Sequence, residues 1–511
     1  MVTPQFPPSQ RTTYQFPVYR WIGWLAVGGF AVGLTVMFFI SGLFGVPAPL
    51  GWAVVVILFA LGALLLDRPK LLLAGMMFYF AMMPGNRLLG LIGVPMPSFL
   101  DELFFLPFIA VIVMNWIQRR QLAEATVFPL VFCLIAALSW YVNGHAGIFT
   151  AIQVTMIMLK SYILWYFCRL TCTFESDRQM ARWIWIYIVY AAIQYGYNVL
   201  WQGGLWVRIH PDTSGGVFGP DRVFGGAHIV GYISMFALFL LTGWWVSIGR
   251  NASRRKRVWA TVCLLVIVYN FVFMTDTKHA LILGPLAFWP FLFHPAFSAR
   301  VRIHLALGGL LFMLAAAVYF HMAGVRGGLM AQIGNVKDSP KGEILNAVTV
   351  DFPHLVPYPL LGAGPGRFTS NQAVEARMPL ARRYIVPYDD QQRRLSYWRS
   401  QGNVVQSSIL GIVRTDFFKL MGEFGWLGTA VFYSFYVWII YRLFRKSMER
   451  PINHLASGLF LGLACCITFL MFITFLIGVV TVPVLAFPLW LFIGRSWDMP
   501  LPAKSIEPAG K

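Results

Sequence analysis

The sequence has little charge for its length. Only 12% of its 511 residues are charged, whereas a soluble domain carries about 25%. At the same time 58% of the residues are hydrophobic. A chain with so few charges cannot solvate a globular surface of this size, which excludes one large water-soluble domain. Long apolar segments with few charges are typical of membrane-spanning helices, which pair their own backbone groups inside lipid.

Acidic residues are scarcer than basic ones. The chain has 20 Asp and Glu against 40 Lys and Arg, a net charge of +20. The basic residues lie in short clusters between apolar segments, which is the pattern of cytoplasmic connections in membrane proteins. We therefore expect membrane lipids as partners and no nucleic acid.

Cysteine pairs, metal-ligand spacing and internal repeats are also missing. All six cysteines lie within or beside apolar segments, and the one large polar loop has none, so no disulfide framework is expected. No His, Cys or acidic spacing indicates a metal, and we expect no cofactor. The lack of a repeat disfavours an inverted-repeat transporter.

Apolar segments fill most of the chain. They lie near 21–45, 50–66, 71–84, 99–117, 126–143, 147–169, 182–201, 227–249, 258–274, 280–294, 303–323, 417–443, 456–475 and 478–494. The third and tenth are short, and one of them could be re-entrant, so about 12–14 spans are expected. Every second connection is basic, which predicts cytoplasmic termini. The predicted fold is an all-α, polytopic transmembrane helix bundle in a bacterial inner (cytoplasmic) membrane.

The expected organisation has four parts. An N-terminal transmembrane bundle of about eleven spans covers residues 1–323, and a large periplasmic loop covers 324–416. The C-terminal transmembrane spans follow over 417–495, and a cytoplasmic tail covers 496–511. A loop of this length without a function is uncommon.

The long loop is basic where outside loops are expected to be poor in Lys and Arg. Between residues 367 and 414 it holds Arg367, Arg377, Arg382, Arg383, Arg393, Arg394, Arg399 and Arg414, against Glu375, Asp389 and Asp390. Arginine binds phosphate and carboxylate through two parallel hydrogen bonds. The cluster indicates either a site for an anionic headgroup or a solvated face that touches lipid phosphates.

Other ionisable residues lie at the ends of, or inside, apolar segments. Asp276 and Lys278 flank a tight outside turn, where they either pair with each other or serve a site. Lys160 lies inside the sixth segment, so it either reaches back to the cytoplasm or pairs with Asp101 or Glu102.

Three stretches together resemble the O-antigen polymerase and ligase family of lipid-linked glycan transferases. Arg222-Val-Phe-Gly-Gly resembles the Arg-x-x-Gly entry into a mid-chain helix. Thr275-Asp-Thr-Lys278-His-Ala resembles a Ser-x-Ser-Arg-Gly/Ala turn. Leu361-Gly-Ala-Gly-Pro-Gly-Arg-Phe368, followed by Arg414 and then Glu423-Phe-Gly-Trp-Leu-Gly, resembles the Gly-rich turn and Glu-x-Gly-x-x-Gly helix entry. The match covers roughly 215–430 in the same order as in the family.

This resemblance implies a GT-C-like fold and a metal-independent membrane glycosyltransferase. The donor would be a glycan on undecaprenyl pyrophosphate, and the acceptor would be a glycan or a lipid-linked glycan. Cationic side chains would neutralise the leaving group. Arg222 and Lys278 would bind the pyrophosphate, and the further expected substrate-binding residues are His279, Arg367, Arg382 and Arg383.

Arg414 departs from the family pattern, because ligases have a histidine at its position that activates the acceptor. Arginine stays protonated and is a poor general base. The expected catalytic residues are therefore Arg414, His354 and Asp416, with His279 and His228 as further candidates for the base.

An arginine at this position favours a polymerase over a ligase. The predicted function is the joining of repeat units into an O-antigen, capsule or exopolysaccharide, with a chain-length regulator or export proteins as possible partners. One alternative is a ligase that transfers finished glycan to lipid A core or another acceptor. Another is a transporter or flippase for a lipid-linked glycan, which would place charges deep in several spans.

Overall fold

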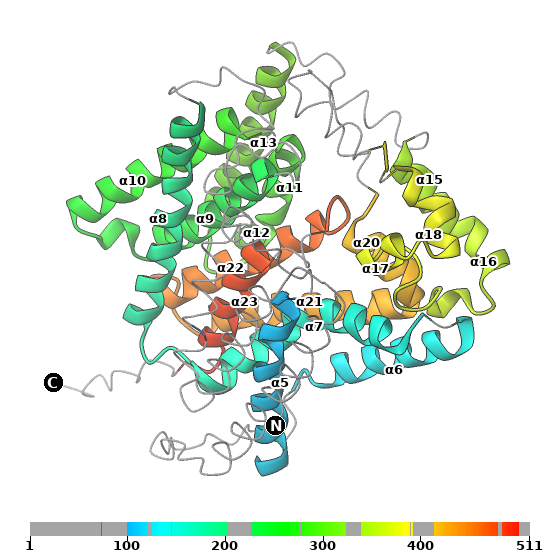
Figure 1. Ribbon diagram of the computed structural model, residues 1–511. Helices are drawn as coiled ribbons and strands as arrows, with labels where there is room; N and C mark the ends of the chain where they lie inside the picture. The colour runs from blue at the N-terminus through cyan, green and yellow to red at the C-terminus, as the bar shows by residue number, and fades with distance from the viewer. Residues whose placement is uncertain are drawn as a thin grey trace, which may run out of the picture. The chain divides into compact units, whose positions relative to one another are not determined.

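The regular structure of the described residues is entirely helical (Figure 1). The computed structural model describes residues 73, 100–119, 124–144, 146–202, 226–275, 277–322, 339–388, 390–391, 413–478 and 483–499. No strand occurs within these ranges. Apart from Leu73 in the third, the first three expected segments lie outside them, as do both termini.

From the fourth segment on, every expected apolar segment coincides with a helix or with two or three consecutive ones. The bounds are α5 (Leu100–Arg119), α6 (Val127–Asn143), α7 (Ile148–Thr171), α8 (Asp177–Gln202), α9 (Gly226–Ile248), α10 (Arg254–Tyr269) with the π-helical turn η5 (Asn270–Met274), α11 (Lys278–Ala287), α12 (Trp289–Phe293), α13 (Ala299–Met322), α20 (Asp416–Lys419) with the π-helical turn η9 (Leu420–Phe424) and α21 (Gly425–Met448), α22 (Leu455–Ile473) and α23 (Pro483–Ser496).

Five of these helical segments are long and apolar enough to cross a membrane. They are Ile148–Thr171, His228–Ile248, Arg254–Met274, Asp416–Met448 and Leu455–Ile473. Within the described residues, this agrees with the coarse expectation of an all-α fold that has several helices able to span a membrane. The number of spans, their direction and the compartment stay predictions.

The chain divides into two compact units. One contains Met1–Gln121 and Tyr166–Cys172, and the other contains Leu122–Trp165 and Thr173–Lys511. In the first unit the ring of Phe108 stacks on that of Phe167, with 4.0 Å between their centroids.

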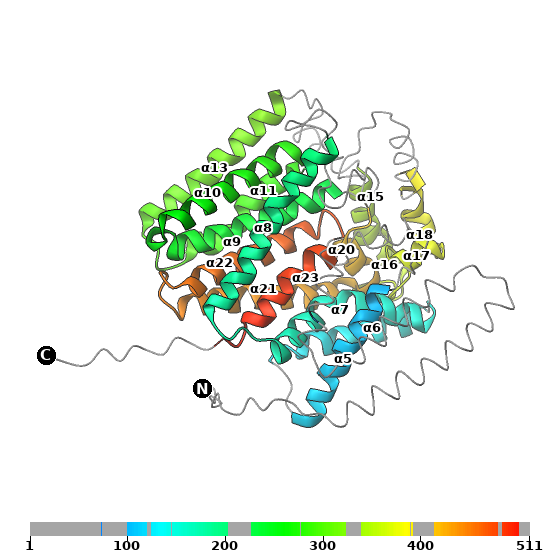
Figure 2. The same ribbon diagram turned by 60° about the vertical axis from the view of Figure 1, so that its left-hand side comes forward.

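Helix α22 forms the centre of the second unit, where it contacts α9 and α21 (Figure 2). At its crossing with α9, a Cβ on Gly243 would meet the carbonyl of Gly458, and a Cβ on Gly458 would meet that of Gly243. Small residues let two backbones approach closely, which is a common way for helices to associate in membranes.

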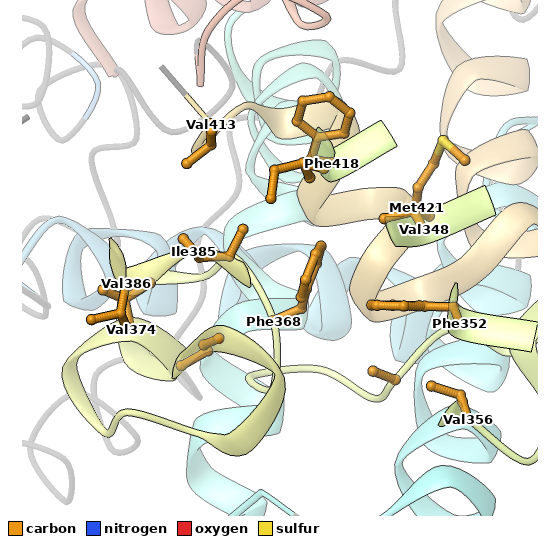
Figure 3. Packing of buried hydrophobic residues seen from close by; sticks show 14 residues of the cluster. Val348, Phe352, Val356, Phe368, Val374, Ile385, Val386, Val413, Phe418 and Met421 are labelled. Atoms are coloured by element: carbon orange, nitrogen blue, oxygen red, sulfur yellow. The ribbon is translucent and has the colours of Figure 1, made fainter. Parts of the chain in front are cut away.

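The described part of the long loop folds as short helices. They are α15 (Pro340–Asn346), the π-helical turn η6 (Ala347–Asp351), α16 (Phe352–Leu355), the 3-10 turn η7 (Pro359–Leu361), α17 (Asn371–Glu375) and α18 (Pro379–Tyr384). Their apolar side chains share one core with Val413, Phe418 and Met421 (Figure 3). The loop therefore packs on the start of the apolar segment Asp416–Met448.

Candidate functional site

A glycine-rich turn, residues 362–368, lies where the long loop meets α6 and the apolar segment Asp416–Met448. Gly362, Gly364 and Gly366 have φ values of +76°, +99° and +83°. Residues with a Cβ avoid this left-handed region, so the spacing of the three glycines is a requirement of the backbone. Asn143, at the end of α6, donates from its side chain to the Gly362 carbonyl at 2.6 Å.

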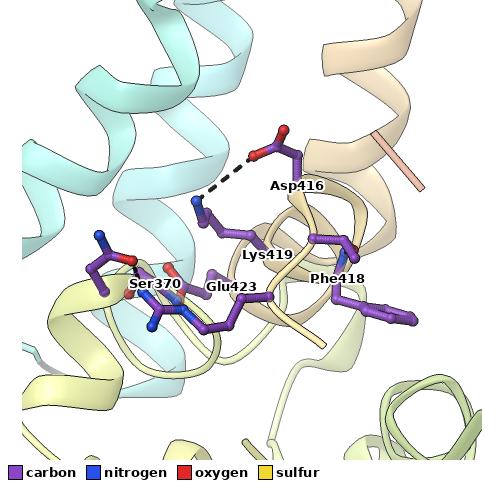
Figure 4. Close-up of polar contacts among 8 residues, drawn as sticks. Ser370, Asp416, Phe418, Lys419 and Glu423 are labelled. Carbon is purple, nitrogen blue, oxygen red and sulfur yellow. Dashed lines mark hydrogen bonds and ion pairs between the residues drawn. The ribbon is translucent and has the colours of Figure 1, made fainter. Parts of the chain in front are cut away.

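Glu423 holds this turn in place from within the helical segment (Figure 4). Its fully buried carboxylate accepts hydrogen bonds from the backbone N–H groups of Gly366 at 2.8 Å, Phe368 at 3.2 Å and Ser370 at 2.7 Å. Bonds from N–H groups to a carboxylate are stronger than those between neutral groups. Glu423 is therefore an anchor for the turn.

Arg367 extends from the turn to the end of α6. Its guanidinium donates to the carbonyls of Asn143 and Ala363. A cation is stabilised at a helix C-terminus, where the last carbonyl groups carry partial negative charge. Burial lowers the pKa of Arg367. These contacts hold the turn against α6, and the expected substrate-binding role of Arg367 stays a prediction.

An ion pair lies beside the turn, at the start of the apolar segment. Asp416 and Lys419 are both buried, and their carboxylate oxygen and Nζ are 3.8 Å apart (Figure 4). Thr415 caps α20 by accepting from the Phe418 N–H, which aims both side chains from the first turn of the segment. Lys160 of α7 is also buried and lies within electrostatic range of Lys419.

Arg414 joins this cluster from the loop side. It is partly buried, its guanidinium donates to the Asn371 side chain at the start of α17, and it too lies within electrostatic range of Lys419. The expected catalytic pair Arg414 and Asp416 thus lies together with two lysines. Lys419 also lies within electrostatic range of the buried Glu423 carboxylate. Cations grouped in this way can neutralise charge that develops on an anionic group.

Hydroxyl groups extend the polar cluster into the helices. Tyr433 of α21 shares a hydrogen bond of 2.7 Å with Thr474, and Tyr436 shares one of 3.1 Å with Ser161 of α7. Buried polar side chains are costly between apolar helices unless they are paired. Here each tyrosine hydroxyl of α21 is hydrogen-bonded to a hydroxyl group of another segment.

A second cluster contains His279, the other expected binding residue in this region. The Tyr232 hydroxyl of α9 and His279 Nε2 of α11 share a hydrogen bond, and the rings of His228 and His279 are 5.4 Å apart. Lys341 of α15 lies within electrostatic range of His279 and donates to the Leu476 carbonyl. Burial lowers the pKa of Lys341 to about 7.

The two clusters meet at the end of α22. Phe417, one residue after Asp416, donates its N–H to the Thr474 carbonyl at 3.2 Å, and Lys341 binds the carbonyl of Leu476. Lys341 and the start of the apolar segment Asp416–Met448, which are far apart in the sequence, thus both contact one helix end.

The remaining expected site residues are Arg382, Arg383, His354, Lys278 and Arg222. Arg382 and Arg383 are exposed on α18, with Arg383 over the Tyr384 ring at 5.0 Å. His354 is exposed on α16. Lys278 begins α11, and Arg222 lies outside the described residues.

No protein-family model matches this chain. No curated protein matches it either. Within the described residues, no group of three or more His, Cys, Asp or Glu is arranged to hold a metal ion.

Sequence reasoning did not select Lys419, Glu423 or Lys341 as site residues. The sequence could have indicated Lys419, because it lies three positions after Asp416 and therefore shares its helix face. Ionisable residues at the start of an apolar segment are functional candidates. Glu423 is part of the Glu-x-Gly-x-x-Gly motif, but the sequence does not indicate which groups its carboxylate binds. Lys341 had no signal, since its burial depends on α22, which follows it by more than a hundred residues.

Proposed function

We propose that this chain is a membrane polymerase that joins oligosaccharide repeat units, carried on undecaprenyl pyrophosphate, into a surface polysaccharide. The observation that carries this proposal is the buried Asp416–Lys419 pair below the glycine-rich turn, with Arg414 and Lys160 close by. Buried ion pairs are weak contributors to stability, and ionisable groups at membrane depth are functional candidates.

In the proposed step, an acceptor sugar hydroxyl attacks the anomeric carbon of the donor glycan. A new C–O bond forms, and the bond from that carbon to the pyrophosphate oxygen breaks. The acceptor proton passes to the Asp416 carboxylate, and the electron pair leaves with the pyrophosphate. Lys419 and Arg414 would neutralise the charge that develops on this leaving group.

The other expected residues keep their roles as part of the proposal. Arg222 and Lys278 would add positive charge around the pyrophosphate, as the family resemblance implies. His279, in its cluster with Lys341, would bind the donor from the other side of the α22 end. Exposed Arg382 and Arg383 would hold an acidic acceptor chain.

A transporter for a lipid-linked glycan is the second candidate function. It is favoured by the burial of Lys160, Lys419 and Glu423 in the apolar helical segments, because transport pathways are lined by such residues. The polymerase is preferred because Glu423 is fully engaged in holding the turn, and because Arg414 and Asn371 link the ion pair to the loop.

The test is the glycan profile of a deletion strain that is complemented with variants of the full chain. Lys419→Gln and the partly exposed Arg414→Gln should each lower long-chain polymer by roughly a hundredfold, the usual effect of removing one group that stabilises transition-state charge. Arg445→Gln is the matched control, since Arg445 is exposed at the other end of the same helical segment.

The profile separates the functions. Carrier-linked single units at the outer surface, without polymer, support the polymerase. Long chains that remain on the carrier identify a ligase. Units retained on the inner side identify a transporter. Full polymer output from both variants, at normal protein level in the membrane, would rule out the assigned roles.

A further inference from the structure

A groove opens on the second unit between α8, α9 and α10. It encloses about 1160 Å³, which exceeds the roughly 300–1,000 Å³ of an ordinary small-molecule pocket. Its α8 wall carries Ile186, Val189 and Ile193, and Trp259 of α10 lies opposite. These side chains are exposed. The groove therefore offers a long apolar surface to a large ligand.

One end of the groove is basic. Arg178 and Arg182 line it from the first two turns of α8, and Lys256 lines it from the first turn of α10. Residues four apart share a helix face, so both arginines point to the same side. None of these three cations forms an ion pair with another described residue. The nearby carboxylate of Asp177 is paired with His454 at 2.9 Å.

The length of the apolar wall matches one leaflet of a bilayer. Arg182 and Ile193 are eleven positions apart on α8, or about 16 Å at 1.5 Å per residue. The hydrocarbon core of a bilayer is about 30 Å thick. Trp185, next to the basic end, contacts Trp244 edge to face, and tryptophan is enriched at the level of lipid headgroups.

We propose that this groove is a binding site for an anionic phospholipid of the surrounding membrane. The phosphate would lie between Arg178, Arg182 and Lys256, and an acyl chain would follow α8 as far as Ile193. A phospholipid fits better than a polyprenyl carrier, because a polyprenyl chain is longer than one leaflet. This inference does not depend on the proposed polymerase activity.

The test measures lipid binding to the purified full-length protein by native mass spectrometry, with an equimolar mixture of dioleoyl-phosphatidylglycerol and dioleoyl-phosphatidylcholine. The protein should retain phosphatidylglycerol preferentially. The triple variant Arg178→Gln, Arg182→Gln and Lys256→Gln should bind it at least tenfold more weakly, since each cation near a phosphate contributes about a fivefold change in affinity.

A matched control removes the same number of charges from the start of α10, beside Lys256. Arg254→Gln, Arg255→Gln and Arg257→Gln alter exposed cations on α10 that do not line the groove, so phosphatidylglycerol binding should change less than twofold. A second variant, Val189→Trp, keeps every charge and fills the apolar wall. It should also weaken retention of the lipid.

Three results would overturn the proposal. The first is equal retention of the two lipids by the unaltered protein. The second is an equal loss of binding in the groove and control triple variants, which would mean a bulk charge effect. The third is displacement of phosphatidylglycerol by a stoichiometric amount of polyprenyl phosphate, which would assign the groove to a carrier lipid.

Discussion

At the scale of single residues, Lys341 shows how folding changes the protonation of a lysine that nothing in the sequence marks as unusual. Its side chain is only 6% exposed, and burial lowers its pKa from 10.5 to about 7. The amine still donates to the Leu476 carbonyl in either protonation state. The fold therefore accepts Lys341 most easily when it is neutral.

This burial predicts a pH dependence of stability. Above about pH 7 the folded chain leaves Lys341 neutral, whereas the unfolded chain keeps the proton up to about pH 10.4. The unfolded state then binds more protons, so the free energy of unfolding rises with pH through this window, by on the order of 5 kcal/mol at most. Thermal unfolding of the purified protein at a series of pH values measures the slope.

Lys341→Met should remove that slope, because the methionine side chain does not titrate. Arg382→Met is the control, since it removes an exposed cation from the same loop and should leave the slope unchanged. An identical slope in Lys341→Met and the unaltered protein would contradict the prediction.

At the scale of elements, the glycine-rich turn joins three parts of the second unit. Asn143 and Ser139 of α6 donate to the Gly362 carbonyl, Glu423 accepts from the turn, and the loop core packs on Phe368. A Cβ on Gly422 would meet the Phe368 ring. A substitution that destabilises the turn is therefore expected to loosen the loop and the start of α21 as well.

Gly362→Ala should destabilise this assembly by about 2 kcal/mol or more. The substitution places a Cβ at a φ of +76°, which costs about 1–2 kcal/mol, and that Cβ lies 2.7 Å from the Glu423 carbonyl carbon. Limited proteolysis of the loop measures the effect as faster cleavage.

Gly308→Ala on α13 is the matched control. A Cβ there meets no atom within 4 Å, and alanine favours a helix over glycine by roughly 0.5–1 kcal/mol. Its cleavage rate should equal that of the unaltered protein. If both variants are cleaved at one rate, the turn does not hold the loop.

At the scale of the whole molecule, the arrangement across the membrane is open to direct measurement. The basic connections predict that the loop lies outside and that the start of α10 lies inside. Glu375→Cys, on the exposed end of α17, should react with a membrane-impermeant maleimide on intact spheroplasts. Arg255→Cys, in the first turn of α10, should react only after permeabilisation.

The unaltered chain is the control for this labelling. Of the six cysteines only Cys133 is exposed, and it lies in apolar helix α6. Labelling of Arg255→Cys on intact spheroplasts, with Glu375→Cys protected, would invert the predicted topology and move the groove to the outer leaflet.

The sequence by itself determined where the helices lie. Apolar runs and their basic ends are local features, and a helix satisfies its own backbone, so α7 and α22 begin and end within a few residues of the predicted segments. The glycines at 362, 364 and 366 were matched to a glycine-rich turn through the family resemblance. Arg414 was selected because it stands where the ligases of the resembled family have a histidine, and Asp416 was selected as a candidate base beside it.

Only the tertiary structure decided which of these groups meet. The carboxylate of Glu423 binds backbone N–H groups more than fifty residues earlier in the chain, and the His279 cluster forms across α9, α11 and α15. Such contacts depend on how helices pack, which a local pattern does not specify. The burial of Lys341 and Lys419 follows from that packing, because water is excluded only after distant helices have come together.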